Sequence, residues 1–160
     1  MRVLGIDPGL ERIGYGVVDR DGSRLTPVHF GLIETPRIGL LPRLDLVHQG
    51  VRELIAEHRP DAVATEALLF SVNRKTAMDV AKSLGAILLA VSQSGLPWCE
   101  YTPPEVKLTV VGTGAAEKKQ VQYMVTRLLG LTATPKPDDV ADALAIAICH
   151  ALKSRLVLPR

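Results

Sequence analysis

Four acidic residues stand where a charged side chain needs an explanation: Asp7, Glu66, Asp139 and Asp142. Asp7 ends a short apolar segment, directly before a Pro-Gly pair. Glu66 lies between Ala-Val-Ala-Thr and Ala-Leu-Leu-Phe, and a charge among apolar neighbours costs free energy unless it is paired or binds a metal. Asp139 and Asp142 are three residues apart at the start of an apolar segment, a spacing that puts both on one helix face.

Each of these acids also has a purely structural explanation. Asp-Pro-Gly is a common turn sequence, so Asp7 can be a turn residue. Glu66 can belong to a structural salt bridge. Asp139 can satisfy free N–H groups in the first turn of a helix and suit the helix dipole. Asp142 fits that explanation less well, because it adjoins the wholly apolar run Ala-Leu-Ala-Ile-Ala-Ile.

Taken together, the four acids indicate metal-dependent chemistry. If the strands that end at Asp7 and Glu66 are neighbours, their carboxyl ends place both acids side by side. A helix that brings Asp139 and Asp142 to the same edge completes a cluster whose pKa values rise unless cations hold it together. Oxygen ligands without a histidine–cysteine set favour Mg²⁺, or Mn²⁺ as a substitute. Two such ions about 3.5–4 Å apart can hydrolyse a phosphodiester, which is the reaction we predict.

Hydrophobic periodicity predicts the elements that must position these acids. We expect strands at residues 2–7, 14–19, about 28–34, 61–66 and 98–101. We expect helices between Pro42 and Pro60, and at about 74–92, 104–111, 116–129 and from about 138 onward. Three antiparallel strands followed by alternating helices and strands predict an α/β fold, with a mixed five-stranded sheet flanked by helices.

Length and composition set the outer limits. With 160 residues, of which 47% are apolar, the chain suits one domain over residues 1–160. A net charge of +2 permits nucleic-acid binding without requiring it. Cys99 and Cys149 are far apart in the sequence, which indicates neither a disulfide framework nor a zinc site. We find no signal peptide and no apolar run that could cross a membrane, so we expect a cytoplasmic protein.

Five sequence blocks together resemble the RuvC family of bacterial Holliday-junction resolvases. The blocks are GIDPG (5–9), GYGVV (14–18), TEALLF (65–70), EVKLTVVGTGAAEKKQVQ (105–122) and DDVADALAIAICH (138–150). The resemblance implies a ribonuclease-H-like fold and a homodimer that resolves four-way DNA junctions with Mg²⁺, in recombination and repair. It also implies cooperation with the RuvA–RuvB branch-migration machinery. It assigns the catalytic, metal-binding carboxylates to Asp7, Glu66, Asp139 and Asp142, and leaves the adjacent Asp138 as an expected helix cap.

The resemblance further assigns phosphate contacts to Lys107 and Lys118, with Lys119 beside the latter. The alternative is a solvated helix face, which the flanking Glu105 and Glu117 would suit. Lysines in the first turn of a helix oppose the helix dipole, which favours the functional interpretation.

Residues just beyond the second acid are further candidates for DNA contact. Arg74 and Lys75 are expected to contact phosphates. The family can carry a base-stacking aromatic residue shortly after this acid, and the register places Leu69 there. Phe70, which is adjacent, can either stack on a base or belong to the core.

The helix at residues 74–92 is our candidate for the dimer contact, because of its long stripe of Ala81, Leu84, Ile87 and Leu88. Two other classes of function compete with a resolvase. An actin-like or sugar-kinase ATPase lobe would need a second lobe around its nucleotide, and this chain has the length of one. A catalytically silent nucleic-acid-binding module would be expected to have lost some of the four acids.

Overall fold

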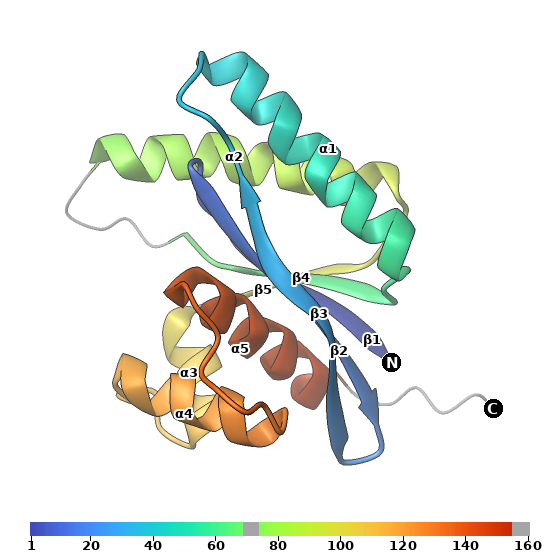
Figure 1. The fold of residues 1–160 in the computed structure, drawn as a ribbon, viewed down its shortest axis with the longest axis vertical. Helices are drawn as coiled ribbons and strands as arrows, with labels where there is room; N and C mark the ends of the chain where they lie inside the picture. Colours follow the sequence, from blue (N-terminus) through green and yellow to red (C-terminus); the bar gives the residue numbers. More distant parts are fainter. Residues whose placement is uncertain (69–73, 155–160) are drawn as a thin grey trace.

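Five strands and five helices make up the part of the chain that the structure, a computed structural model, describes: residues 1–68 and 74–154, without the side chains of 74–76. The sheet order is β3-β2-β1-β4-β5, and Figure 1 shows how the helices lie around it. The strands are β1 (Arg2–Asp7), β2 (Arg12–Asp21), β3 (Arg24–Glu34), β4 (Ala62–Glu66) and β5 (Trp98–Tyr101). The helices are α1 (Leu40–His58), α2 (Arg74–Gln93), α3 (Pro103–Val111), α4 (Lys118–Leu128) and α5 (Asp138–Lys153).

The sheet is of mixed direction, as predicted. β1 pairs antiparallel with β2, and β2 with β3, whereas β4 pairs parallel with both β1 and β5. The predicted strand bounds are too short in the β2–β3 hairpin, where pairing continues out to Asp21 and Arg24. These polar residues are exposed at the tip of the hairpin, so apolar alternation does not mark them, although their backbones still form the ladder.

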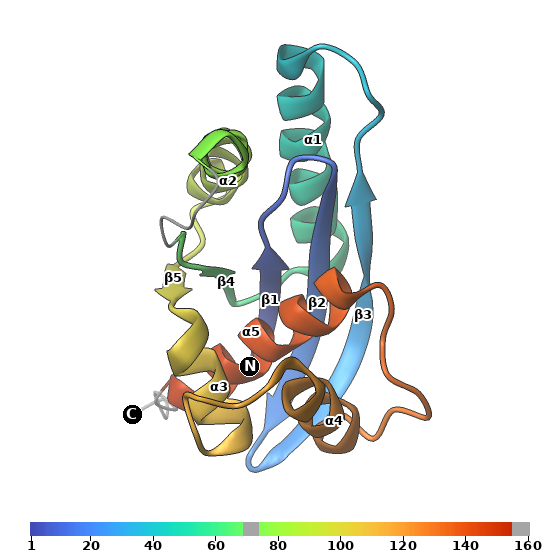
Figure 2. The ribbon, with the colours of Figure 1, turned by 90° about the vertical axis from the view of Figure 1, so that its left-hand side faces the viewer.

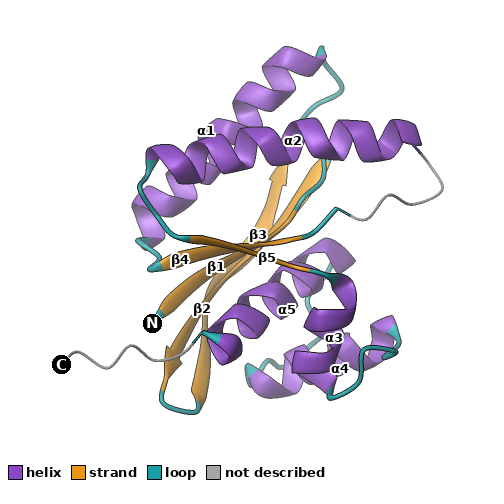
Figure 3. Cartoon of the chain, turned by 180° about the vertical axis from the view of Figure 1, so that it is seen from behind, coloured by secondary structure: helices purple, strands orange, loops and turns teal. Residues whose placement is uncertain are grey.

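Helices cover both faces of the sheet, with α1 and α2 on one face and α3, α4 and α5 on the other (Figure 3). The central strand β1 serves two cores because its side chains alternate between the faces. Leu4 and Ile6 belong to the core beneath α1 and α2, whereas Val3 belongs to the core beneath α5. Because β1 is buried on both faces, it holds the residue at its carboxyl end, Asp7, in a fixed position.

Helix α5 packs directly against strands β1 and β2, with its backbone close to theirs (Figure 2). Two glycines make this possible. A Cβ atom at Gly5 would collide with the backbone of Ala143, and one at Gly14 would collide with the backbone of Asp139. Only residues without a side chain allow the first turns of α5 to lie directly on these strands.

Within residues 1–68 and 74–154, none of the helices combines the length and the apolar character that crossing a lipid bilayer requires.

Candidate active site

Asp7 and Glu66 are the last residues of two neighbouring parallel strands, β1 and β4. The β1–β4 register pairs Ile6 with Thr65, so the two acids are the next residues along each strand. Parallel strands end at the same edge of a sheet, and the two carboxylates therefore emerge side by side. The expected adjacency of these two strands is confirmed.

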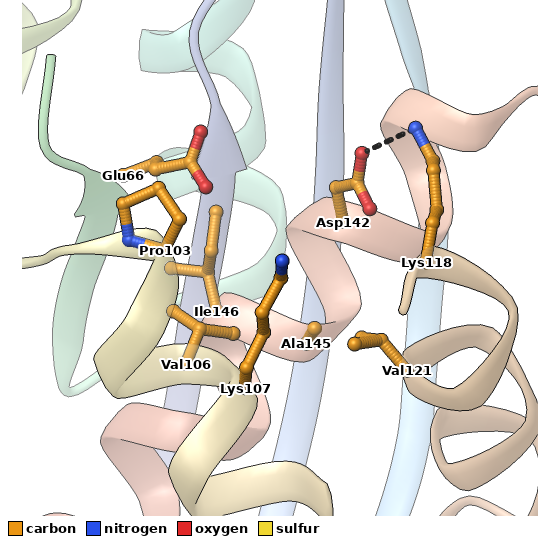
Figure 4. Close-up of a pocket in the computed structure, with 9 residues that line it drawn as sticks. All are labelled: Glu66, Pro103, Val106, Lys107, Lys118, Val121, Asp142, Ala145 and Ile146. Atoms are coloured by element: carbon orange, nitrogen blue, oxygen red, sulfur yellow. Dashed lines mark ion pairs between the residues drawn. The ribbon is translucent and has the colours of Figure 1, made fainter. Parts of the chain in front are cut away.

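The start of α5 brings the other two acids to this edge. In the β1–β2 ladder Gly14 lies opposite Asp7, and the same glycine packs against the backbone of Asp139. Asp139 is thereby placed above the end of β1. Asp142, almost one turn further along α5, lines a pocket together with Glu66 (Figure 4). The structure therefore brings all four predicted acids to one end of the sheet.

The acids crowd one another enough to change their protonation. Burial, together with the negative charges of Glu66, Asp142 and Asp139, raises the pKa of Asp7 to about 8. Burial also raises the pKa of Glu66 and that of Asp142. Clustered carboxylates with raised pKa values indicate a site that binds cations, because cations are what would restore the charged forms.

Two basic side chains already face this cluster. The ammonium of Lys118 lies 3.2 Å from a carboxylate oxygen of Asp142. The guanidinium of Arg12, at the start of β2, lies 3.4 Å from a carboxylate oxygen of Asp139. Asp139 and Asp142 thus each have a cation beside them.

Sequence reasoning did not single out Arg12. The signal was present, because a β1–β2 hairpin that pairs Asp7 with Gly14 also brings the first residue of β2 close to the acids. Arg12 and Asp139 also line a hollow of about 420 Å³ that Arg43 and Asp79 border.

The pocket that Glu66 and Asp142 line has a volume of about 190 Å³ and also has basic and apolar lining residues. Lys107 and Lys118 enter it from α3 and α4, on the side facing Glu66 and Asp142 (Figure 4). Both lysines oppose the rise in the pKa of Glu66. The remaining lining residues are Pro103, Val106, Val121, Ala145 and Ile146.

Glu105 and Glu117, which would have suited a solvated face, are engaged elsewhere. Glu105 accepts a hydrogen bond of 2.9 Å from the Thr102 backbone in a capping box and pairs with Lys153 at 3.1 Å. Glu117 caps α4 in a second capping box, which makes Lys118 the first residue of that helix. Neither acid pairs with Lys107 or Lys118 in the described structure, so the two lysines remain directed at the acid cluster.

The other candidate DNA contacts are placed less fully. Lys119 is exposed on α4 and does not line the 190 Å³ pocket. Arg74 and Lys75 begin α2, but their side chains lie outside the described residues, as do Leu69 and Phe70 altogether.

The expectation that Asp138 caps α5 is wrong. Pro137 occupies the N-cap position, and Asp138 is the first residue of the helix. Its carboxylate instead lies 3.1 Å from the Lys118 ammonium and accepts a hydrogen bond of 3.0 Å from Gln122. The side chain of Asp138 thus faces α4.

The donor set suits a hard divalent cation, since every candidate ligand is a carboxylate oxygen. In the described residues, however, no three Asp, Glu, His or Cys side chains lie close enough together to enclose an ion as they stand. An ion held by three or more of these carboxylates would need them closer together than they lie here, and it would compete with Arg12 for Asp139 and with Lys118 for Asp142.

Comparisons with known proteins agree on one family. Residues 3–150 match the family described as Crossover junction endodeoxyribonuclease RuvC. The protein of that name from Syntrophomonas wolfei is 48% identical over 157 residues, which cover 98% of this chain and 91% of that protein. The one from Rubrobacter xylanophilus is 50% identical over 155 residues, covering 96% of this chain and 87% of that protein.

Solved structures agree with the sequence comparison. Thermus thermophilus RuvC is similar with a TM-score of 0.88 and 39% identity, over 94% of this chain and 93% of that one. The same protein in complex with Holliday junction substrate gives a TM-score of 0.90 and 38% identity, with the same coverage. The predicted ribonuclease-H-like fold is confirmed. The chain belongs to the RuvC family of crossover junction endodeoxyribonucleases.

Proposed function

We propose that this protein resolves four-way DNA junctions, in recombination and repair, by hydrolysing one phosphodiester in each of two strands. Asp7, Glu66, Asp139 and Asp142 act as the catalytic metal ligands, and we assign the whole chain, residues 1–160, to one nuclease domain. The observation that supports this assignment best is the convergence of the four acids at the common end of β1, β4 and α5.

Family membership implies a divalent metal ion, and its identity and number are our proposal. An all-carboxylate donor set supports Mg²⁺, with Mn²⁺ as a substitute, and four carboxylates suffice for two ions. When bound, such ions would supply an activated water and stabilise the departing 3′ oxygen. With a pKa of about 8, the Asp7 carboxyl is mostly protonated at neutral pH until a nearby cation stabilises its charged form.

The chain's own basic residues bind and orient the scissile phosphate. Lys107 and Lys118 lie where a phosphate would meet the acids, and their charges offset the negative charge of phosphate and carboxylates together. The apolar side chains of Val106 and Ile146 form one wall of the same pocket, which limits the access of bulk water. Arg74, Lys75 and Lys119 are proposed to contact phosphates further along the strands, and Phe70 to stack on a base.

We propose a homodimer, because two identical sites related by a two-fold axis match two like strands of a junction. The stripe expected on α2 is partly wrong as a contact, since Leu84 and Ile87 are buried within the chain's own core. Met78 and Leu89, about three turns apart, are 55% and 53% exposed and are better candidates on the same helix. Family membership also supports the RuvA–RuvB branch-migration machinery as a partner.

The decisive experiment measures cutting of four-way junction DNA, and of matched linear duplex, with Mg²⁺, with Ca²⁺ and with chelator. We expect junction-selective cutting with Mg²⁺ and little with Ca²⁺, whose flexible coordination suits the reaction poorly. A silent binding module would bind without cutting under every condition. An actin-like ATPase lobe would bind nucleotide and ignore the junction. Full cutting in excess chelator would refute metal catalysis.

A further inference from the structure

Four side chains form a connected group between helices α4 and α5. Lys118 and Gln122 are four residues apart on α4, and Asp138 and Asp142 are four apart on α5, so each pair shares a helix face. The Lys118 ammonium lies 3.1 Å from Asp138 and 3.2 Å from Asp142. Gln122 donates a hydrogen bond of 3.0 Å to the other oxygen of Asp138. The lysine is thus held between two carboxylates.

These two carboxylates differ in their surroundings. Asp142 lines the pocket with Glu66, and its side chain is 32% exposed. Asp138 faces outward, with a side chain that is 61% exposed, and it does not line the pocket. Lys118 therefore has an inner partner that belongs to the acid cluster and an outer partner that does not.

A divalent ion at Asp142 would compete with Lys118 for the inner carboxylate. Two cations on one carboxylate repel each other, so the ion binds more tightly when the ammonium withdraws. Asp138 offers it a position on the same helix face without loss of its ion pair. Gln122 fixes the carboxylate of Asp138 through one oxygen and leaves the other for the lysine.

We propose that Asp138 is a positioning residue that draws the Lys118 ammonium away from Asp142 and thereby lets the site take up its divalent ion. The inference rests on the metal site proposed above. It makes Asp138 neither a metal ligand nor a helix cap. Its effect on the ion passes through Lys118 and depends on the presence of that lysine.

The test is a cycle of variants whose Mn²⁺ affinity is measured by calorimetry, without DNA. In the otherwise unchanged protein, Asp138→Asn should weaken Mn²⁺ binding by about two- to fivefold, the effect expected of an exposed ion pair. Lys118→Gln should tighten Mn²⁺ binding. In the Lys118→Gln background, Asp138→Asn should have no further effect. Asp138→Glu, which keeps the charge, should restore most of the affinity.

Controls separate this inference from its alternatives. Asp21→Asn removes an exposed acid at the far end of β2 and should leave the affinity unchanged. An equal loss from Asp138→Asn in both backgrounds would overturn the inference, because it would mean that the charge of Asp138 acts directly on the ion. No loss in either background would overturn it as well. If Asp142→Asn left Mn²⁺ binding intact, the proposed metal site itself would be wrong, and this inference would fail with it.

Discussion

The guanidinium of Arg12 reaches from the start of β2 to the carboxylate of Asp139, with 3.4 Å between Nη2 and Oδ2. Lys118 has the same relationship to Asp142, at 3.2 Å. Both acids that α5 contributes to the cluster, Asp139 and Asp142, are thus balanced by a side chain of the protein itself. An ion that binds these acids would compete with a built-in cation, which would lower its apparent affinity.

Replacing Arg12 should therefore strengthen ion binding. The Arg12 side chain is 52% exposed, so its ion pair contributes at most about 1 kcal/mol, equivalent to roughly fivefold in affinity. We expect Arg12→Gln to tighten Mn²⁺ binding by up to about that factor in calorimetry without DNA. Arg24→Gln is the matched control, because Arg24 is exposed at the tip of the β2–β3 hairpin, at the opposite end of β2 from Arg12. Unchanged affinity in the Arg12→Gln protein would remove Arg12 from the site.

Removing charge from the acids should separate cutting from binding. Each of Asp7→Asn, Glu66→Gln, Asp139→Asn and Asp142→Asn keeps the shape of the side chain and removes a ligand charge. We expect cutting of junction DNA to fall by at least about 100-fold, as for the loss of a group central to the transition state. Binding should persist or strengthen, because it comes mainly from lysine and arginine on phosphates.

Gel-shift and cleavage assays on the same four-way junction measure the two effects together. Asp19→Asn, which alters an acid paired with Arg2 at 2.7 Å, is the control that should keep cutting. Near-normal cutting by the Asp7→Asn and Glu66→Gln proteins would show that the chemistry takes place elsewhere.

The raised pKa of Asp7 makes stability depend on pH when divalent ions are removed by chelator. The pKa is about 8 in the folded protein and near 3.9 in an unfolded chain. Between these values the folded state binds more protons than the unfolded state, so stability falls as pH rises from about 4 to about 8. Asp7→Asn removes this loss, because its amide does not ionise.

We expect chelator-treated Asp7→Asn and unchanged protein to melt together near pH 4. Near pH 8 the variant should melt at least about 3 °C higher, since 1 kcal/mol corresponds to roughly 2–4 °C for a chain of this size. Added Mg²⁺ should reduce this difference in melting temperature, because it stabilises the unchanged protein, which keeps the Asp7 carboxylate, and not the variant. Melting temperatures are measured by calorimetry. A difference between the two proteins that stays the same from pH 4 to pH 8 would contradict a raised pKa for Asp7.

Local pattern was enough to predict most of the fold. Strand β4 reads as continuous small apolar residues up to Glu66, and α5 as an apolar helix that starts with acids, so both elements were predicted close to their observed bounds. The order of elements along the chain predicted a mixed sheet. The proximity of Asp7 and Glu66 was predicted only with the added assumption that β1 and β4 are neighbours. The structure confirms that assumption.

What the sequence could not provide is the partner of each charge. The contacts of Asp138 are with Lys118 and Gln122, which lie 20 and 16 residues away on another helix. Capping rules consider only residues near the helix end in the sequence, so they could not predict these contacts. The close approach of α5 to β1 depends on Gly5, whose lack of a side chain has meaning only once the helix above it is known. Long-range packing determines both features.

Lys107 offers a test of DNA binding that does not involve an ion pair with the acids. It lines the pocket from α3, directed at the position proposed for the scissile phosphate. Lys107→Ala should weaken binding equally to junctions of every sequence and reduce the salt slope of the binding constant by about one. Lys153→Ala is the control, because Lys153 pairs with Glu105 on the other side of α3. An unchanged salt slope would mean that Lys107 does not contact a DNA phosphate and lies on a solvated helix face.

The last prediction joins the acid cluster to the proposed dimer. If each subunit carries a complete site, each cuts one strand, and a dimer with one inactive subunit can make only one nick. Mixing unchanged subunits with Asp7→Asn subunits, tagged so that the mixed dimer can be purified, should give singly nicked junctions in a single-turnover assay. Hydrolysis with the 3′ oxygen as leaving group also predicts 5′-phosphate and 3′-hydroxyl ends, which DNA ligase seals without processing. Two nicks from a mixed dimer would mean that one site cuts both strands. Ends that ligase cannot join would mean that the bond between phosphorus and the 3′ oxygen is not the one that is broken.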